Sequence, residues 1–133
     1  RATFDQFALN GATPAQGITQ EANNTVKKTI EQTQGAIGYL AFSYFRGNGN
    51  IEKLSINGVK PTAENVQSGK FPVWAYEHMY TKGKPDKLEK AFLDYMMSSA
   101  VQNKLVPAQG YISSAKMQVK RDAKGNVTKK SGQ

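Results

Sequence analysis

Apolar residues recur at helical spacing in several parts of the chain, separated by short polar or glycine-containing segments. The clearest amphipathic helix follows Pro85, because Leu88, Phe92 and Tyr95 fall on one face when apolar positions repeat every three to four residues. Similar spacing predicts four further helical segments, at residues 2–9, 19–32, 61–66 (a single turn) and 100–106, which is expected to stop at Pro107.

Other segments carry the patterns of strands. Residues 34–45 place two glycines three apart before an apolar run, which predicts a short strand buried on both faces. Its backbone is expected to pass close to another element at Gly35 and Gly38, where a side chain would not fit. Residues 73–81 alternate in the manner of a strand with one aromatic face.

Shorter apolar runs complete the predicted architecture. Residues 51–56 and 110–112 predict two short strands, and residues 117–126 predict a solvent-facing hairpin with a glycine in its turn. Strands and helices alternate through most of the chain, and this order is typical of the α/β class.

Composition narrows the chemistry available to the protein. The 133 residues, of which 38% are hydrophobic, suffice for one small domain, and no apolar run approaches the roughly 20 residues that span a bilayer. Cysteine is absent, so disulfides and thiolate catalysis are excluded. His78 is the single histidine, and a zinc site would therefore need carboxylates for nearly all its ligands. We expect neither a metal nor a cofactor.

Positive charge is concentrated near the end of the chain. Between Lys116 and Gln133 there are six basic residues and one acidic residue, so this tail carries +5 of the net charge of +8. One interpretation is a solvated terminus. The other is a small basic module that binds nucleic acid or an anionic wall polymer through residues 116–130. Aromatic residues are not interleaved with these lysines, as base stacking requires, and this favours the solvated terminus.

An ordered series of short motifs resembles one known family. The motifs are Arg1-Ala2-Thr3-Phe4-Asp5, Gln34-Gly35-Ala36-Ile37-Gly38-Tyr39, Ile56-Asn57-Gly58-Val59-Lys60-Pro61-Thr62, Ser68-Gly69-Lys70-Phe71-Pro72-Val73 and Gln109-Gly110-Tyr111-Ile112. In that order, and over roughly residues 1–128, they resemble the C-terminal half of the phosphate-binding proteins of ABC importers. The resemblance implies capture of inorganic phosphate without catalysis.

The same resemblance implies a domain organisation. Members of the family have two α/β lobes of the class II periplasmic-binding-protein type, with the ligand between the lobes. By analogy, residues 1–70 complete the second lobe, and residues 71–133 return to complete the first, ending in a basic hairpin and tail at 114–133. The family's Ser-Gly-Thr phosphate loop would fall just before Arg1. We therefore expect a C-terminal piece that is incomplete without the N-terminal half.

Arg1 is the main candidate for ligand contact. A cation in the first turn of a helix is disfavoured by about 0.3–1 kcal/mol unless an anion binds at that helix end beside it. The resemblance places Arg1, Ala2 and Thr3 next to phosphate, with Ala2 and Thr3 contributing backbone N–H groups. The alternative is that Arg1 extends into solvent.

Other chemistry-bearing residues have simpler interpretations. No carboxylate or serine is spaced to pair with His78, and Glu77 and Asp94 are not paired for acid–base work. The glycines of residues 46–50 lack the following helix that a phosphate cradle needs. Five aromatic residues of the strand predicted at 73–81 and of the helix after Pro85 could line a stacking pocket: Trp74, Tyr76, Tyr80, Phe92 and Tyr95. Core packing between that strand and that helix is the favoured interpretation.

The resemblance also implies partners and a location. The partners would be inorganic phosphate, the membrane subunits of an ABC importer and the N-terminal half of the same protein. Lysine- and asparagine-rich usage without cysteine suits an extracellular lipoprotein of the Gram-positive type, and a periplasmic protein is the other possibility.

Overall fold

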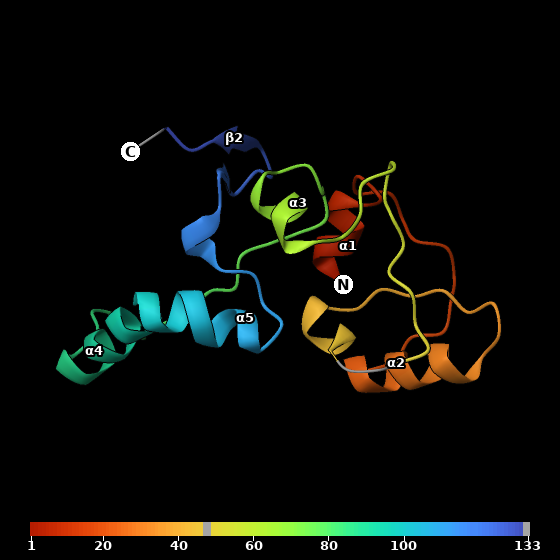
Figure 1. Ribbon diagram of the computed structural model, residues 1–133, viewed down its shortest axis with the longest axis horizontal. Helices are drawn as coiled ribbons and strands as arrows, with labels where there is room; N and C mark the ends of the chain where they lie inside the picture. The colour runs from red at the N-terminus through yellow and green to blue at the C-terminus, as the bar shows by residue number, and fades with distance from the viewer. Residues whose placement is uncertain (47–48, 132–133) are drawn as a thin grey trace.

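Residues 1–46 and 49–131 are described by the computed structural model, which combines short helices with one two-stranded sheet. Figure 1 shows α2 and α4 at opposite ends of an elongated arrangement. The helical elements are α1 (Ala2–Phe7), α2 (Asn23–Gln32), the 3₁₀ helix η1 (Phe42–Phe45), α3 (Ala63–Gln67), α4 (Lys87–Met96), the π-helix η2 (Val101–Leu105), α5 (Val106–Ala108) and the 3₁₀ helix η3 (Ser114–Lys116). The strands are β1 (Val119–Arg121) and β2 (Val127–Lys129).

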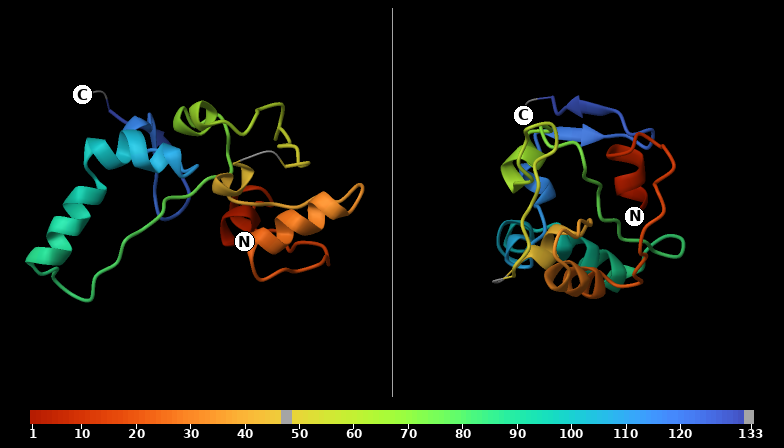
Figure 2. Two further views of the ribbon diagram at one scale, coloured as in Figure 1. Left: turned by 60° about the horizontal axis from the view of Figure 1, so that its bottom comes forward. Right: turned by 90° about the vertical axis from the view of Figure 1, so that its right-hand side faces the viewer.

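Helix α4 forms where its apolar spacing predicts it, and its beginning is fixed by a capping box. The Asp86 carboxylate accepts a hydrogen bond from the Glu89 N–H, and the Glu89 carboxylate accepts one from the Asp86 N–H, both at 2.8 Å. These two bonds satisfy donors that a helix start would otherwise leave free. In Figure 2, α4 projects away from the rest of the molecule.

The other predicted helices form with altered ends. The helix expected over residues 19–32 begins only at Asn23, and the turn expected at 61–66 becomes α3, capped by the Thr62 hydroxyl, which accepts from the Asn65 N–H. The stop expected at Pro107 is wrong, because α5 continues through it to Ala108. Pro107 lies in the first turn of α5, where its missing N–H costs nothing.

Four of the predicted strands do not form. Residues 34 and 35 form a turn, and residues 36–41 then lead into η1 without pairing; residues 73–81 are also unpaired, and residues 110–112 join no sheet. In the segment 51–56, only Ile56 takes part in pairing, through an isolated bridge to Val59. A strand needs a neighbouring strand for its backbone hydrogen bonds. Within the described residues, no neighbouring strand lies beside these segments.

The glycines of the 34–45 segment behave differently from each other. A Cβ at Gly38 would lie 2.8 Å from the Ile30 side chain of α2, so the expected close approach is confirmed there. At Gly35 no atom lies within 4 Å of such a Cβ, and the close approach predicted there is wrong. Gly35 instead has a φ of +77°, a conformation that side chains disfavour.

The predicted hairpin forms, but the prediction that it faces solvent is wrong for Met117 and Val119, which are each 6% exposed and belong to the core. Strands β1 and β2 are antiparallel, with Val119 opposite Lys129 and Arg121 opposite Val127. The Gln118 N–H donates to the Gln67 carbonyl at 2.8 Å, which joins the hairpin to α3 along one edge of the molecule (Figure 1). Five apolar residues form the core between these elements: Val66, Phe71, Trp74, Met117 and Val119.

Candidate functional site

Arg1, Ala2 and Thr3 lie at the beginning of α1. Arg1 is the N-cap residue, and its side chain runs along the helix, with Nε 3.7 Å from the Asp5 carboxylate. The Arg1 side chain remains 63% exposed. Its guanidinium can therefore be reached by an anion, in competition with Asp5.

The backbone of this segment offers hydrogen-bond donors. The first N–H groups of any α-helix have no acceptor within the helix, so those of Ala2 and Thr3 are available to a ligand. Arg1 and Ala2 are exposed, and Thr3 is half-buried. Donors and a cation at one helix end are the combination that binds a phosphate or another oxyanion.

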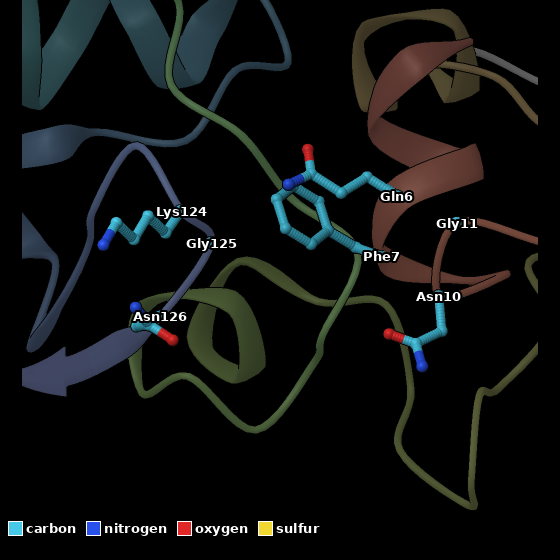
Figure 3. Close-up of a pocket in the computed structure, with 7 residues that line it drawn as sticks. All are labelled: Gln6, Phe7, Asn10, Gly11, Lys124, Gly125 and Asn126. Atoms are coloured by element: carbon cyan, nitrogen blue, oxygen red, sulfur yellow. The ribbon is translucent and has the colours of Figure 1, made fainter.

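A shallow cavity of about 290 Å³ lies at the opposite end of α1 (Figure 3). Its lining comes from the last turn of α1, the turn that follows it and the hairpin turn: Gln6, Phe7, Asn10, Gly11, Lys124, Gly125 and Asn126. Lys124 is the one cation of this lining. The cavity does not include the three candidate residues, and sequence reasoning gave no sign of it because its two sides are more than a hundred residues apart.

The Arg121 guanidinium contacts two segments that are distant from it in the sequence. Its guanidinium donates to the carbonyl of Pro72 at 2.9 Å and to the carbonyl of Trp74. Its Cζ lies 3.7 Å from the centroid of the Phe7 ring and 4.2 Å from that of Trp74. Burial lowers the pKa of Arg121, and the nearby Tyr76 hydroxyl acts in the opposite direction.

The Arg121 contacts bear on the basic tail. One of its six cations is engaged with Phe7, Pro72 and Trp74, and Lys130 donates to the Ser114 carbonyl at 3.4 Å. The rest of the tail's basic side chains are exposed. Nothing in this arrangement supports the nucleic-acid alternative over a solvated hairpin. The sequence predicts Arg121 only as a basic residue of the solvent-facing hairpin, because no local pattern marks its distant partners.

The aromatic face of residues 73–81 is present although the strand is not. Neighbouring rings of Trp74, Tyr76, His78 and Tyr80 follow one another with centroids 5.3–6.3 Å apart. The favoured packing of this face against the following helix is wrong, because Phe92 and Tyr95 on α4 are more than half exposed. The extended segment carries α4 away from the core, as Figure 2 shows.

The remaining candidates contribute no site. His78 is exposed and makes no ion pair within the described residues, which also hold no group of three potential metal ligands. The expected turn at 46–50 falls partly outside the described residues, at positions 47 and 48. No helix among residues 1–46 and 49–131 is long and apolar enough to cross a membrane.

Comparison with known proteins identifies the class. Residues 1–100 match the PBP superfamily domain, so the chain belongs to that superfamily of solute-binding proteins. Among individual relatives, it is 55% identical over 125 residues to the phosphate-binding protein PstS of Bacillus subtilis (strain 168), across 94% of this chain and 41% of that protein. The resemblance to the phosphate-binding proteins is therefore confirmed.

Two more distant relatives are also phosphate-binding proteins. The phosphate-binding protein PstS of Borreliella burgdorferi is 33% identical over 101 residues, covering 72% of this chain and 35% of that protein. The phosphate-binding protein PstS 2 of Streptococcus agalactiae serotype V is 31% identical over 85 residues, covering 63% of this chain and 28% of that protein. The chain spans about two fifths or less of the length of the relatives it matches.

Proposed function

We propose that this chain is part of an extracytoplasmic solute-binding protein that captures inorganic phosphate and delivers it to the membrane subunits of an ABC importer, without catalysis. The observation that carries the proposal is the 55% identity, over 94% of the chain, to a phosphate-binding protein. Identity at this level over nearly the whole chain favours a shared ligand as well as a shared fold.

Within this chain, Arg1, Ala2 and Thr3 are the proposed phosphate contacts. Their support is the exposed guanidinium and the free N–H groups of the first turn. The resemblance adds that the family's phosphate loop would fall just before Arg1. The other ligand groups would come from the rest of the protein. Among them we expect a carboxylate that accepts the proton of hydrogen phosphate and so rejects fully ionised sulfate.

The protein is proposed to have two lobes, with residues 1–70 completing one and residues 71–133 the other. Incompleteness of this chain is supported by its accessible surface of 10564 Å². A folded monomer of its mass would expose about 6,900 Å². The excess is partly apolar, since Ile37, Leu88 and Tyr80 are each at least 79% exposed. The N-terminal half would cover these side chains.

The proposed location is outside the cytoplasm, either as a lipid-anchored extracellular protein or in a periplasm. Its support is the membership of a solute-binding superfamily whose ligands are collected before import. Cell fractionation tests the location, and recovery of the protein in the cytosol would contradict it.

Equilibrium dialysis of the intact protein against labelled phosphate tests the function. Saturable binding at micromolar phosphate is expected, with little displacement by sulfate. Equal displacement by sulfate would assign the protein to another oxyanion.

A further inference from the structure

Helix α1 is held at two points along its length. Near its beginning, the Phe4 ring stacks on Tyr39 with centroids 4.2 Å apart and an angle of 8° between the planes. Near its end, the Phe7 ring packs against the Arg121 guanidinium at 3.7 Å. Tyr39 belongs to the same part of the chain as α1, whereas Arg121 comes from the C-terminal hairpin.

The second contact reaches a third segment. The guanidinium that packs on Phe7 also donates to the carbonyls of Pro72 and Trp74 and lies 4.2 Å from the Trp74 ring centroid. Residues 72–74 follow directly on the boundary at which the two proposed lobes meet. Arg121 therefore ties α1 to this boundary segment, and Figure 2 shows the hairpin passing beside α1.

Stability alone does not account for the contacts of Arg121 with Phe7, Pro72 and Trp74. Within the described residues Arg121 forms no salt bridge, and its Nε and the Trp74 Nε1 are buried without an acceptor. The neighbouring carboxylate, Asp122, is bonded to its own turn instead. A half-buried charge without a counter-ion, and buried donors left unpaired, both oppose folding. Two carbonyls in fixed geometry nevertheless match a planar guanidinium better than any other side chain.

We propose that Arg121 is a positioning residue for phosphate binding, which fixes α1 against residues 72–74 and so sets the phosphate affinity of the intact protein. The proposal rests on the proposed function, because α1 carries Arg1, Ala2 and Thr3. Arg121 contacts α1 at Phe7, at the opposite end of the helix from Arg1. Its effect passes through the Phe7 ring to the orientation of the helix.

The test compares Arg121→Met with Lys120→Met in the intact protein. Both changes remove one positive charge, but Lys120 is exposed and its side chain lies on the other face of β1. Phosphate affinity is measured by calorimetry at a temperature where all variants are folded, and melting temperature is measured separately. We expect Arg121→Met to weaken phosphate binding about 2- to 30-fold and Lys120→Met to leave it unchanged.

Further variants separate positioning from general stability. Arg121→Lys should not restore affinity, because an ammonium cannot serve both carbonyls while packing on two rings. The double variant Phe7→Leu/Arg121→Met should bind phosphate no more weakly than whichever single variant binds it more weakly. The reason is that both changes break the same contact, between Phe7 and Arg121. A lower melting temperature with unchanged phosphate affinity in Arg121→Met would overturn the proposal, as would full recovery in Arg121→Lys.

Two remaining outcomes are also decisive. If Arg121→Met does not fold, Phe7→Leu is tested in its place, because leucine keeps an apolar side chain at position 7. Weaker phosphate binding by Phe7→Leu supports the proposal, and unchanged binding overturns the proposal. If the unsubstituted protein binds no phosphate, the proposed function itself fails, and this result is distinct from any effect of the variants.

Discussion

At the scale of single residues, Arg1 is the side chain that we propose for contact with phosphate. Its only ionic partner within the described residues is the half-buried Asp5, whose carboxylate lies 3.7 Å from the Arg1 Nε. A pair at this distance with a largely exposed arginine contributes little to stability, so it competes only weakly with a bound ligand. A phosphate bound at the beginning of α1 would replace Asp5 as the ionic partner of the Arg1 guanidinium.

We predict that Arg1→Gln weakens phosphate binding by the intact protein about 10- to 100-fold, the usual value of a hydrogen bond to a charged group. Melting temperature in the absence of phosphate should hardly change. Lys28→Gln is the matched control, because Lys28 is an exposed cation on α2. Equal phosphate affinity in both variants would remove Arg1 from the site.

Gly110 is a second residue whose role can be tested separately. It has a φ of +80°, and a Cβ there would lie 2.8 Å from the Ser43 Cα and from the Arg46 Cδ. Gly58 has nearly the same φ, +77°, but no atom lies within 4 Å of its Cβ position.

We predict that Gly58→Ala costs about 1–2 kcal/mol, from backbone strain alone. Gly110→Ala should cost about 1–3 kcal/mol more, because the backbone at Ser43 must also move. Denaturant unfolding of the intact protein measures both. Similar losses for the two variants would show that residues 43–46 do not pack against Gly110.

At the scale of elements, local signals predicted helices better than strands. The α4 pattern includes its own cap at Asp86, and the hairpin includes its own turn glycine, Gly125, so local sequence indicates both elements. Residues 34–41 and 73–81 have strand-like sequences, but a strand also requires a neighbour, and none of the described residues supplies one. The neighbour is a property of the fold that no local pattern contains.

The same limit applies to the candidate site. Arg1, Ala2 and Thr3 could be selected from a motif and a helix start. The Arg121 contacts could not, because Phe7 and Trp74 are 114 and 47 residues away in the sequence. An arginine in an alternating hairpin resembles any other surface charge until the fold brings its partners together.

The hairpin turn has a pH dependence of its own. The Asp122 carboxylate accepts hydrogen bonds at 2.9 Å from the Lys124 N–H, the Asn126 N–H and the Asn126 side-chain amide. The bonds from Asn126 contribute most, and they lower the Asp122 pKa below its ordinary value of 3.8. The folded hairpin therefore favours the charged carboxylate. This stabilisation is complete above the unfolded pKa and is lost as pH falls through the folded one.

We predict that the hairpin loosens in acid, with faster amide exchange of Val119 and Arg121 as the pH falls through the lowered pKa of Asp122. Asp122→Asn, which carries no titrating group, should lose this pH response while keeping the turn. Amide exchange followed by NMR across the pH range provides the measurement. An acid response that persists in Asp122→Asn would assign it to a different carboxylate.

At the scale of the whole molecule, the surface exceeds what a folded chain of this size leaves in water. The accessible area of 10564 Å² includes exposed apolar side chains at both ends of the arrangement. Ile37 lies in an unpaired extended segment, and Leu88 and Phe92 lie on the projecting helix α4. Exposed apolar area of this kind marks surfaces that another part of a protein covers.

We predict that residues 1–133 produced alone associate with copies of themselves and bind a hydrophobic dye such as ANS. Co-production with the preceding half should give one soluble complex with little dye binding. Light scattering after size-exclusion chromatography distinguishes the two states. A compact monomer that binds no dye would contradict the proposal that a second half covers these faces.

Phosphate titration of the intact protein by calorimetry, with sulfate titrated in parallel, tests the central claim most directly. The account predicts saturable binding of one phosphate per protein at micromolar concentrations, with little or no heat from sulfate. The absence of saturable heat with phosphate would contradict it.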